Sequence, residues 1–273
     1  MNVLLDPAAR PVIGHRGNRA YAPENTIESF AQAIALGADA IEFDVRLSAD
    51  GIPVVHHDPT LSRTTDGIGE VSRMNFVKLK DLDAGANFTR DGGKTFPFRG
   101  AGHRIPTFEE VVEAFPSTPF LIEIKEPLAA PAIREIIEKH KAEWRCLIDA
   151  YSELAVRRFE DSSIATGASR AGVASLMKQV LLRRPIERMP YNALCIPLSY
   201  HGLPLPVRRL AKAAREQGRQ VHVWTVNDPK EAISLWNDGI NGIISDDPGL
   251  MLKTRAGLPH VELLSQAIRP IKN

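Results

Sequence analysis

Cysteine is scarce in this sequence: a chain of 273 residues contains Cys146 and Cys195 and no others. Two cysteines this far apart cannot form the disulfide framework of a small secreted domain, and no CxxC or Cys/His zinc spacing occurs. Each lies within an apolar stretch, where a free cysteine typically behaves as a small buried hydrophobic residue. The sequence therefore excludes a disulfide-stapled protein and a cysteine-based metal site.

Segments that target or anchor a chain are also missing. Residues 1–14 lack the basic stretch, followed by an apolar run of about 7–15 residues, that marks a signal peptide. No uninterrupted apolar run approaches the roughly 20 residues that a membrane-spanning helix needs. We therefore expect a cytoplasmic protein without stable membrane insertion.

An excess of charge of either sign is missing as well. The 34 basic and 33 acidic residues leave a formal net charge of +1. This balance argues against nucleic acid or an anionic membrane as the partner, because both are bound by a broad basic surface. It is compatible with a local basic pocket, since net charge does not report on a few residues inside a cleft.

What the sequence does contain is a regular alternation of short apolar runs and helix-like segments. With 44% hydrophobic and 25% charged residues, the chain has the composition of a globular protein and the length of one α/β barrel. The strand-like runs lie at 11–15, 40–47, 52–57, 120–125, 145–149, 163–167, 193–197, 220–226 and 242–245. The helix-like segments lie at 25–36, 107–115, 131–141, 153–160, 171–182, 206–217 and 229–237.

This alternation predicts parallel strands joined by right-handed crossovers. With the runs at 40–47 and 52–57, which flank the Asp50-Gly51 turn, counted as one, eight such strands are expected, which is the number that closes a (β/α)8 TIM barrel. A doubly wound open sheet is the alternative. Its GxGxxG fingerprint is absent from every junction between a strand and a helix, so the barrel is favoured.

One segment interrupts the alternation, between His57 and Thr107. A loop of this length is uncommon inside a compact domain unless it is functional or disordered. It is rich in turn-forming residues but also contains four phenylalanines, too many for a solvated linker. We therefore predict a single catalytic domain over 1–273 that carries a small folded insertion at 59–104, after the second strand.

Charged residues on the second strand give the first indication of chemistry. The run 41–47 alternates strictly, which places Glu42, Asp44 and Arg46 on one face of the strand. Parallel strands covered on both faces should be apolar throughout, and buried charges are unfavourable unless they are paired, coordinate a metal or line a cavity. An antiparallel strand with one solvated face is the alternative.

The same anomaly recurs at the end of the strand at 120–125, where Glu123 and Lys125 share a face. An internal salt bridge is one explanation. The other is that Glu42, Asp44 and Glu123 end adjacent barrel strands and converge on one ion at the rim where barrel active sites lie. Oxygen ligands alone favour a hard cation, Ca²⁺ or Mg²⁺, over zinc.

Two histidines end neighbouring strands beside these carboxylates, His15 and His57. Imidazole titrates near neutral pH, so the pair is suited to general acid and general base catalysis. His56 should point to the opposite face and is interpreted as structural. Arg16 and Lys125 are the cations best placed for a phosphate, with an ion pair to a nearby carboxylate as the alternative for Arg16.

Later strands add weaker candidates. Trp224 and His222 share a face of the strand at 220–226 and could line a pocket, although core packing is the alternative for Trp224 and is favoured for His222. Asp246 and Asp247 follow the last strand. Either a hydrogen bond to a site residue or a helix N-cap or turn would explain them.

Short segments spread along the chain match the signature motifs of one known family. They are, in order, His15-Arg16-Gly17 with Pro23-Glu24-Asn25-Thr26, Glu42-Phe43-Asp44-Val45, His57-Asp58-Pro59-Thr60-Leu61 followed by Arg63-Thr64-Thr65, Glu123-Ile124-Lys125, Val223-Trp224-Thr225-Val226-Asn227 and Gly242-Ile243-Ile244-Ser245-Asp246. Together they span residues 11 to 248. The chain therefore resembles the glycerophosphodiester phosphodiesterases.

The resemblance implies a TIM barrel with an insertion after the second strand, and the hydrolysis of a glycerophosphodiester to glycerol 3-phosphate and an alcohol. It implies that His15 and His57 are the catalytic pair and that Glu42, Asp44 and Glu123 hold one divalent cation. It also implies that Arg16 and Lys125 contact the substrate phosphate. The chain departs from the family pattern at Ala150-Tyr151, where Ser-Phe is common, and over 163–203.

Two other functions are compatible with the same residues. One is a phospholipase D-like activity on lysophospholipids, for which the insertion at 59–104 could supply a surface for an acyl chain. The other is a non-catalytic barrel that binds phosphorylated ligands. The complete set of two histidines and three carboxylates favours an enzyme that acts on a small-molecule glycerophosphodiester over such a binding protein.

Overall fold

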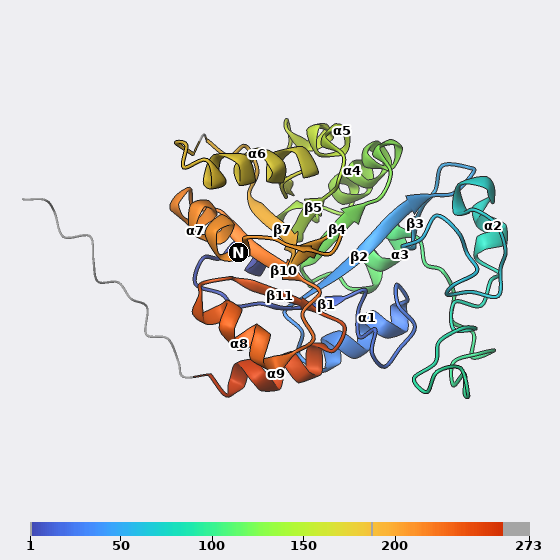
Figure 1. Ribbon diagram of the computed structural model, residues 1–273. Coiled ribbons are helices and arrows are strands. Elements are labelled where there is room, and N and C mark those ends of the chain that lie inside the picture. The colour runs from blue at the N-terminus through green and yellow to red at the C-terminus, as the bar shows by residue number, and fades with distance from the viewer. Residues whose placement is uncertain (1, 187, 259–273) are drawn as a thin grey trace, which may run out of the picture.

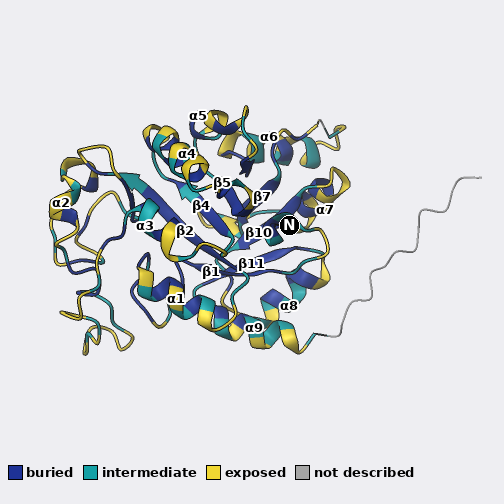
Figure 2. Cartoon of the chain, turned by 180° about the vertical axis from the view of Figure 1, so that it is seen from behind, coloured by how far each residue is buried: buried dark blue, intermediate teal, exposed yellow. Residues whose placement is uncertain are grey.

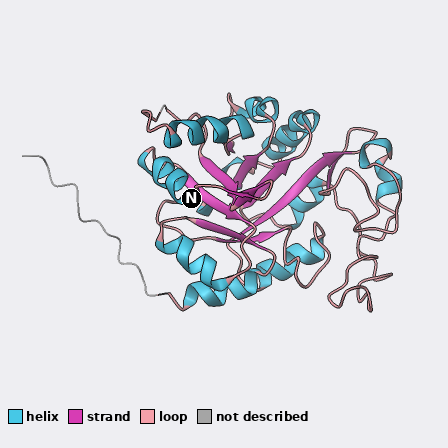
Figure 3. Cartoon of the chain, viewed as in Figure 1, coloured by secondary structure: helices cyan, strands magenta, loops and turns pink. Residues whose placement is uncertain are grey.

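A computed structural model describes residues 2–186 and 188–258 of the chain. Eight parallel strands form its centre, with helices around them (Figures 1 and 3). The strands are β1 (Val12–His15), β2 (Ala40–Leu47), β4 (Phe120–Ile124), β5 (Cys146–Asp149), β6 (Ala165–Thr166), β7 (Ala193–Pro197), β10 (Gln220–Trp224) and β11 (Gly242–Ser245). Each pairs with the parallel strand next to it along the chain, and β1 also pairs with β11.

The ring closes where the end of β6 meets the start of β7. A single parallel bridge joins Gly167 to Ala193, and the backbone N–H of Ala168 donates to the carbonyl oxygen of Ala193 at 3.0 Å. The predicted (β/α)8 barrel is therefore confirmed, and the open doubly wound sheet is excluded because such a sheet keeps two free edges.

The run predicted at 52–57 is not a barrel strand. It contributes β3 (Pro53–Val55), which pairs antiparallel with the end of β2 so that Val45 faces Val55 and Leu47 faces Pro53. The reversal takes place at Gly51, whose φ of +78° lies in the left-handed region that favours glycine. The hairpin extends β2 beyond the barrel rim and carries the chain back to that rim at His56 and His57.

Helices cover the outside of the barrel. They are α1 (Ile27–Ala35), α3 (Phe108–Ala114), α4 (Ala130–Lys139), α5 (Glu153–Val156), α6 (Arg170–Leu181), α7 (Val207–Glu216), α8 (Pro229–Asn237) and α9 (Pro248–Ala256). Thr107 caps α3 in a reciprocal capping box with Glu110. The helix predicted at 153–160 continues past α5 only as the 3₁₀ turn η5 (Arg157–Phe159), and α9 has no counterpart among the predicted helices.

The inside of the barrel is a separate apolar core, formed by strand side chains that alternate with those facing the helices. The barrel strands are buried along most of their length (Figure 2). The 3₁₀ turn η1 (Val3–Leu5) closes its amino-terminal end, where Leu4 is fully buried. The carbonyl oxygen of Leu4 lies 2.9 Å from Nε2 of His222. Burial lowers the pKa of His222 to about 4, so this ring is part of the core, as favoured from the sequence. Both cysteines are buried and free.

The segment between β3 and α3 lies beside the barrel and contains η2 (Val71–Arg73) and α2 (Phe76–Leu79) (Figure 1). Its buried apolar side chains form one cluster with Val54 of β3; they are Leu61, Val71, Leu79, Ala84 and Ile105. The rings of Phe88 and Phe98 pack edge to face at 5.2 Å. These contacts support our proposal that 59–104 is a small folded insertion within a single domain.

Three smaller elements complete the fold: η3 (Pro127–Ala129), η4 (Glu143–Arg145) and a hairpin of β8 (Ser199–Tyr200) and β9 (Leu203–Pro204). The turn η3 follows β4 and the hairpin follows β7, so both lie on the carboxyl-terminal side of the barrel strands. Among residues 2–186 and 188–258, no helix has the combination of length and apolar character needed to cross a bilayer.

Candidate active site

A cavity of about 240 Å³ opens at the carboxyl ends of the barrel strands. His15, Arg16, Glu42, His57, Glu123 and Lys125 all line it, together with Trp224. Residues predicted from five separate stretches of sequence thus meet in one place. They do so because parallel barrel strands all end at the same rim.

Three carboxylates form the floor of this site. Asp44 lies opposite Glu123 in the register of β2 and β4, and Glu42 precedes Asp44 by one full period of the same strand. One oxygen from each of Glu42, Asp44 and Glu123 lies within 4.8 Å of the other two. Glu42 and Asp44 are buried. The cluster is therefore compact enough for all three groups to bind a single ion.

Two cations lie against these acids. The Lys125 ammonium is 2.7 Å from Oδ1 of Asp44 and 2.6 Å from Oε1 of Glu123, while Nε of Arg16 is 3.2 Å from Oδ2 of Asp44. Burial opposes ionisation of Asp44, but Lys125 and Arg16 together hold its pKa below the ordinary range. The salt bridge considered for Glu123 is thus present, and it coexists with the acid cluster.

The three carboxylates of this floor still outnumber the two cations beside them. Burial and the neighbouring charge of Asp44 raise the pKa of Glu42 well above its ordinary value, and burial also raises that of Glu123. Oδ1 of Asp44 and Oε1 of Glu123 both contact the single Lys125 ammonium, so one cation is shared between two carboxylates. Carboxylate oxygens that carry excess negative charge are the donors that Ca²⁺ and Mg²⁺ prefer.

His15 is held by a carboxylate from the opposite end of the chain. Its Nδ1 lies 2.6 Å from Oδ1 of Asp246, and its Nε2 lies 4.0 Å from Oε2 of Glu42. Asp246 also accepts from Arg19 at 3.2 Å and from Asn227 at 2.9 Å. Although burial opposes its ionisation, the bond to His15 helps to lower the pKa of Asp246 to about 2. Asp246 is therefore a carboxylate that orients His15, while Asp247 caps α9.

His57 is held in the same manner by its neighbour in sequence. Its Nδ1 lies 2.6 Å from Oδ1 of Asp58, which is itself paired with Arg63. Its carbonyl oxygen accepts from Nε of Arg46 at 2.8 Å. Burial, which outweighs the attraction of Asp44, lowers the pKa of the His57 ring. A carboxylate on Nδ1 of each ring leaves Nε2 as the nitrogen available to a substrate. His56 instead contacts the carbonyl oxygen of Thr60 at 3.1 Å.

Glu24 connects the loop after β1 to the insertion. Arg16 donates to it at 2.7 Å, Arg19 at 2.9 Å and Arg63 at 2.7 and 2.8 Å. The ion pair considered for Arg16 is therefore formed. The backbone of Arg16 has a φ of +54°, a strained conformation for a non-glycine residue of the kind found at functional sites. This network fixes the guanidinium of Arg16 beside Asp44.

Two residues near the acid cluster were not selected as site residues from the sequence. Asp149 ends β5 and lines the cavity, and burial, reinforced by Glu123, raises its pKa to about 8. The signal was available, because Asp149 ends an apolar strand in the same way as Glu123. Asn25, which belongs to the motif at 23–26, donates from Nδ2 to Oδ2 of Asp44 at 2.9 Å, a contact that depends on the path of the loop after β1.

Comparison with known proteins decides the family. The Glycerophosphoryl diester phosphodiesterase family model matches residues 15–250. The glycerophosphodiester phosphodiesterase of Caldanaerobacter subterraneus subsp. tengcongensis is 33% identical over 248 residues, which cover 88% of this chain and 96% of that protein. The chain belongs to the glycerophosphoryl diester phosphodiesterase family. The resemblance drawn from its motifs is thereby confirmed, as is the prediction of an enzyme.

Solved structures of the family agree with this assignment. A phosphodiesterase of Oleispira antarctica, in complex with the product sn-glycerol-3-phosphate, is 29% identical with a TM-score of 0.72, over 90% of this chain and 96% of that one. The glycerophosphodiester phosphodiesterase of Thermotoga maritima is 30% identical with a TM-score of 0.67, over 89% and 96% of the two chains. The similarity therefore extends over the whole barrel.

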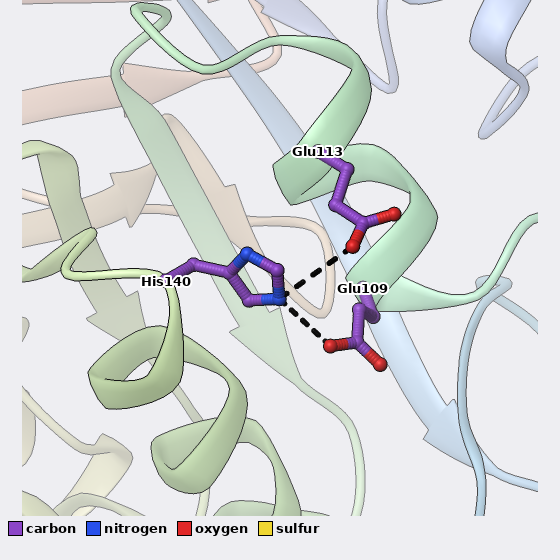
Figure 4. Close-up of side chains that lie close together, drawn as sticks. All are labelled: Glu109, Glu113 and His140. Carbon is purple, nitrogen blue, oxygen red and sulfur yellow. Dashed lines mark hydrogen bonds and ion pairs between the residues drawn. The ribbon is translucent and has the colours of Figure 1, made fainter.

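A second group of side chains of the types that can bind a metal lies on the outside of the barrel. Glu109 and Glu113 of α3 approach His140 at the end of α4, with Nε2 of His140 2.7 Å from Glu109 and 3.9 Å from Glu113 (Figure 4). Lys139 is also 2.7 Å from Glu109. Because Lys139 already pairs with Glu109 and Glu113 is exposed, we interpret the group as a surface ion-pair network.

Proposed function

We propose that this chain hydrolyses glycerophosphodiesters to glycerol 3-phosphate and an alcohol, with one divalent cation, Ca²⁺ or Mg²⁺, held by Glu42, Asp44 and Glu123. The observation that carries the proposal is the grouping of three carboxylate oxygens within 4.8 Å of one another, on the same rim as two histidines oriented by carboxylates. The product bound to the Oleispira antarctica relative supports the choice of substrate.

When bound, the cation would neutralise negative charge that develops on the phosphoryl oxygens. The acid cluster is suited to hold it because burial raises the pKa of Glu42 and of Glu123, and a bound cation would favour the ionised form of both. Asn25 and Arg16 fix the orientation of Asp44 through its Oδ2. The ligands are thus preorganised by groups that do not themselves contact the ion.

The two histidines would transfer the protons. Nε2 of one ring removes a proton from the attacking oxygen, and Nε2 of the other protonates the departing alkoxide, which would otherwise be a poor leaving group at neutral pH. Asp246 and Asp58 accept the Nδ1–H of His15 and His57, so each keeps its ring in the tautomer that leaves Nε2 free.

Lys125 and Arg16 would bind the substrate phosphate. Both line the cavity, and both lie at the edge of the acid cluster. The Arg16 guanidinium is fixed by Glu24, whereas Lys125 is a flexible ammonium that can exchange Asp44 or Glu123 for a phosphate oxygen. Trp224 forms an apolar wall of the same cavity.

The test is the release of glycerol 3-phosphate from glycerophosphocholine, glycerophosphoethanolamine and glycerophosphoglycerol by the purified protein. We expect turnover with Ca²⁺ or Mg²⁺, its loss with chelator, and its recovery when one of the ions is restored. If metal-loaded and chelator-treated protein were equally inactive on all three substrates, the chain would be a binding protein for phosphorylated ligands and not a hydrolase.

A further inference from the structure

The charge of the chain is unevenly distributed, although its net value is close to zero. Residues 162–227 contain ten basic and two acidic residues, whereas the rest of the chain contains 24 basic and 31 acidic residues. The basic segment forms one sector of the barrel, from β6 through α6, β7 and α7 to β10. The near-zero net charge, which argued against an anionic partner, therefore does not describe this side of the molecule.

Within this sector, basic side chains gather where α6 and α7 end. The two helices lie side by side on the outer surface (Figure 1). Because each helix connects two parallel strands, each ends on the side where the next strand begins, which is the amino-terminal end of the barrel. The loop after α6 lies beside the end of α7, where Arg219 donates to the carbonyl oxygen of Met189 at 2.8 Å. Six exposed basic side chains of this region form what we call the basic patch: Lys178, Arg183, Arg184, Arg188, Lys212 and Arg215.

The charges of the basic patch are not neutralised by the protein itself. In the part of the chain that the structure describes, no carboxylate lies within ion-pair distance of any of the six side chains. Arg215 donates to the backbone carbonyl oxygen of Asp238 at 2.7 Å, a contact that leaves its charge in place, whereas the Asp238 carboxylate pairs with Arg208. A group of unpaired charges of one sign creates a local field that attracts a polyanionic partner.

Two exposed leucines accompany the basic patch and indicate which polyanion it fits. Leu181 and Leu182 are 52% and 55% exposed, and they directly precede Arg183 and Arg184. Aliphatic side chains next to basic ones suit a membrane surface, where the former enter the boundary between head groups and acyl chains and the latter contact anionic head groups. Proteins that bind single-stranded nucleic acid instead offer aromatic rings to the bases, and residues 178–188 contain no aromatic residue.

We propose that the basic patch binds the surface of an anionic lipid bilayer, with Leu181 and Leu182 among the lipid head groups and the protein held peripherally. This association is independent of the proposed hydrolysis. The catalytic cavity opens at the carboxyl ends of the strands, whereas the patch lies at the amino-terminal end of the barrel. The active site of a bound enzyme would therefore face the aqueous phase, which suits a water-soluble glycerophosphodiester substrate.

The experiment measures how much of the full chain sediments with lipid vesicles. Vesicles of phosphatidylcholine mixed with phosphatidylglycerol are compared with vesicles of phosphatidylcholine alone, at low and at physiological salt. We expect binding to the anionic vesicles alone, and weaker binding at the higher salt, because salt screens the attraction between exposed charges. Binding to neither kind of vesicle at either salt, or equal binding to both, would overturn the proposal.

Two matched double variants locate the contact. Each basic side chain near an anionic surface strengthens partitioning about fivefold, so Arg183→Gln/Arg184→Gln should lower the partition constant about 25-fold. Arg73→Gln/Lys78→Gln removes the same charge from exposed positions of the insertion, across the barrel from α7 (Figure 1). That distance exceeds the range of screened interactions, so the control should lose less than about twofold. Equal losses in both variants would mean that net charge drives binding, and the patch would be rejected.

The leucines distinguish a bilayer from nucleic acid. Leu181→Ala/Leu182→Ala keeps every charge and places a strong helix former at both positions, and circular dichroism checks that the variant is folded. Loss of this apolar surface should weaken binding to the anionic vesicles at least about tenfold. Vesicle binding that this variant keeps in full, or tighter binding of the native chain to a DNA or RNA oligonucleotide than to the anionic vesicles, would overturn the assignment to lipid.

Discussion

Replacing Asp246 with asparagine tests the orientation of His15 most directly. Oδ1 of Asp246 accepts from Nδ1 of His15 and from Arg19, and its Oδ2 accepts from Asn227. An amide offers one acceptor oxygen and one NH₂ group in place of two acceptor oxygens. In Asp246→Asn at least one of the three donors would therefore face another donor, and the His15 ring could satisfy the new contact only by changing tautomer.

The effect on stability can be estimated from the pKa of Asp246. Burial opposes its ionisation, but the contacts to His15, Arg19 and Asn227 prevail and lower its pKa from 3.8 to about 2. At about 1.4 kcal/mol for each tenfold change, the carboxylate stabilises the folded state by about 2 kcal/mol at neutral pH. Because the folded-state pKa is the lower one, this stabilisation is present above pH 3.8 and is lost as the pH falls through about 2.

The effect on catalysis should be larger than the effect on stability. A ring in the wrong tautomer has a protonated Nε2 where the reaction needs a lone pair, or the reverse. Such a substitution lowers kcat by about 10²–10⁴-fold. The measurements are kcat for glycerophosphocholine at saturating metal and the free energy of unfolding in urea at pH 7, each for the native chain and for Asp246→Asn.

Asp247→Asn is the matched control. It makes the same chemical change at the next residue, but Asp247 caps α9 by accepting from the backbone N–H of Leu250. Asparagine caps a helix about as well as aspartate, so both kcat and stability should change little. A folded Asp246→Asn enzyme that keeps kcat within about threefold of the native value would refute the role of Asp246, since proton transfer of this kind is worth at least about 10²-fold.

Two further predictions concern the second histidine and the outer shell of the barrel. His57→Ala should lower kcat by about 10²–10⁴-fold while the protein stays folded, because the ring is at the cavity and not in the core. Circular dichroism reports whether the variant is folded. A near-native kcat in the folded variant would remove His57 from the mechanism. Arg145→Met should destabilise the protein by about 3 kcal/mol, because the buried guanidinium donates to the carbonyl oxygens of Val112, Phe115 and Thr118, and all three would lose this donor. Urea denaturation measures the second effect, and an unchanged midpoint would contradict it.

Strand positions and the acid cluster could be predicted because they depend on local periodicity. The alternation in β2 places Glu42 and Asp44 on one face, and parallel pairing then brings Asp44 opposite Glu123. The apolar run that became β3 could not be placed in the same manner. A short run has the same apolar pattern whether it pairs in parallel or, as β3 does, pairs antiparallel with β2.

The helix α9 and the strand β6 show a second limit. The segment that forms α9 begins with Asp247 as N-cap and Pro248 at the first helical position, which is a standard start signal. Its apolar face is narrow, so the apolar pattern did not predict a helix there. A strand was predicted at 163–167, but β6 consists of only Ala165 and Thr166, so its bounds could not be predicted from so short a pattern. Its place in the ring follows from the strands on either side of it.

The sequence alone determined the fold class, the residues of the acid cluster and the two histidines, because each is encoded by neighbours a few positions apart. Tertiary structure alone decided which groups support them. Asp246 meets His15 because β1 and β11 close the barrel, and Arg63 reaches Glu24 because the insertion folds back over the rim. The basic patch likewise requires the loop after α6 to lie beside the end of α7. Contacts between distant segments depend on the path of the whole chain, and no local pattern records that path.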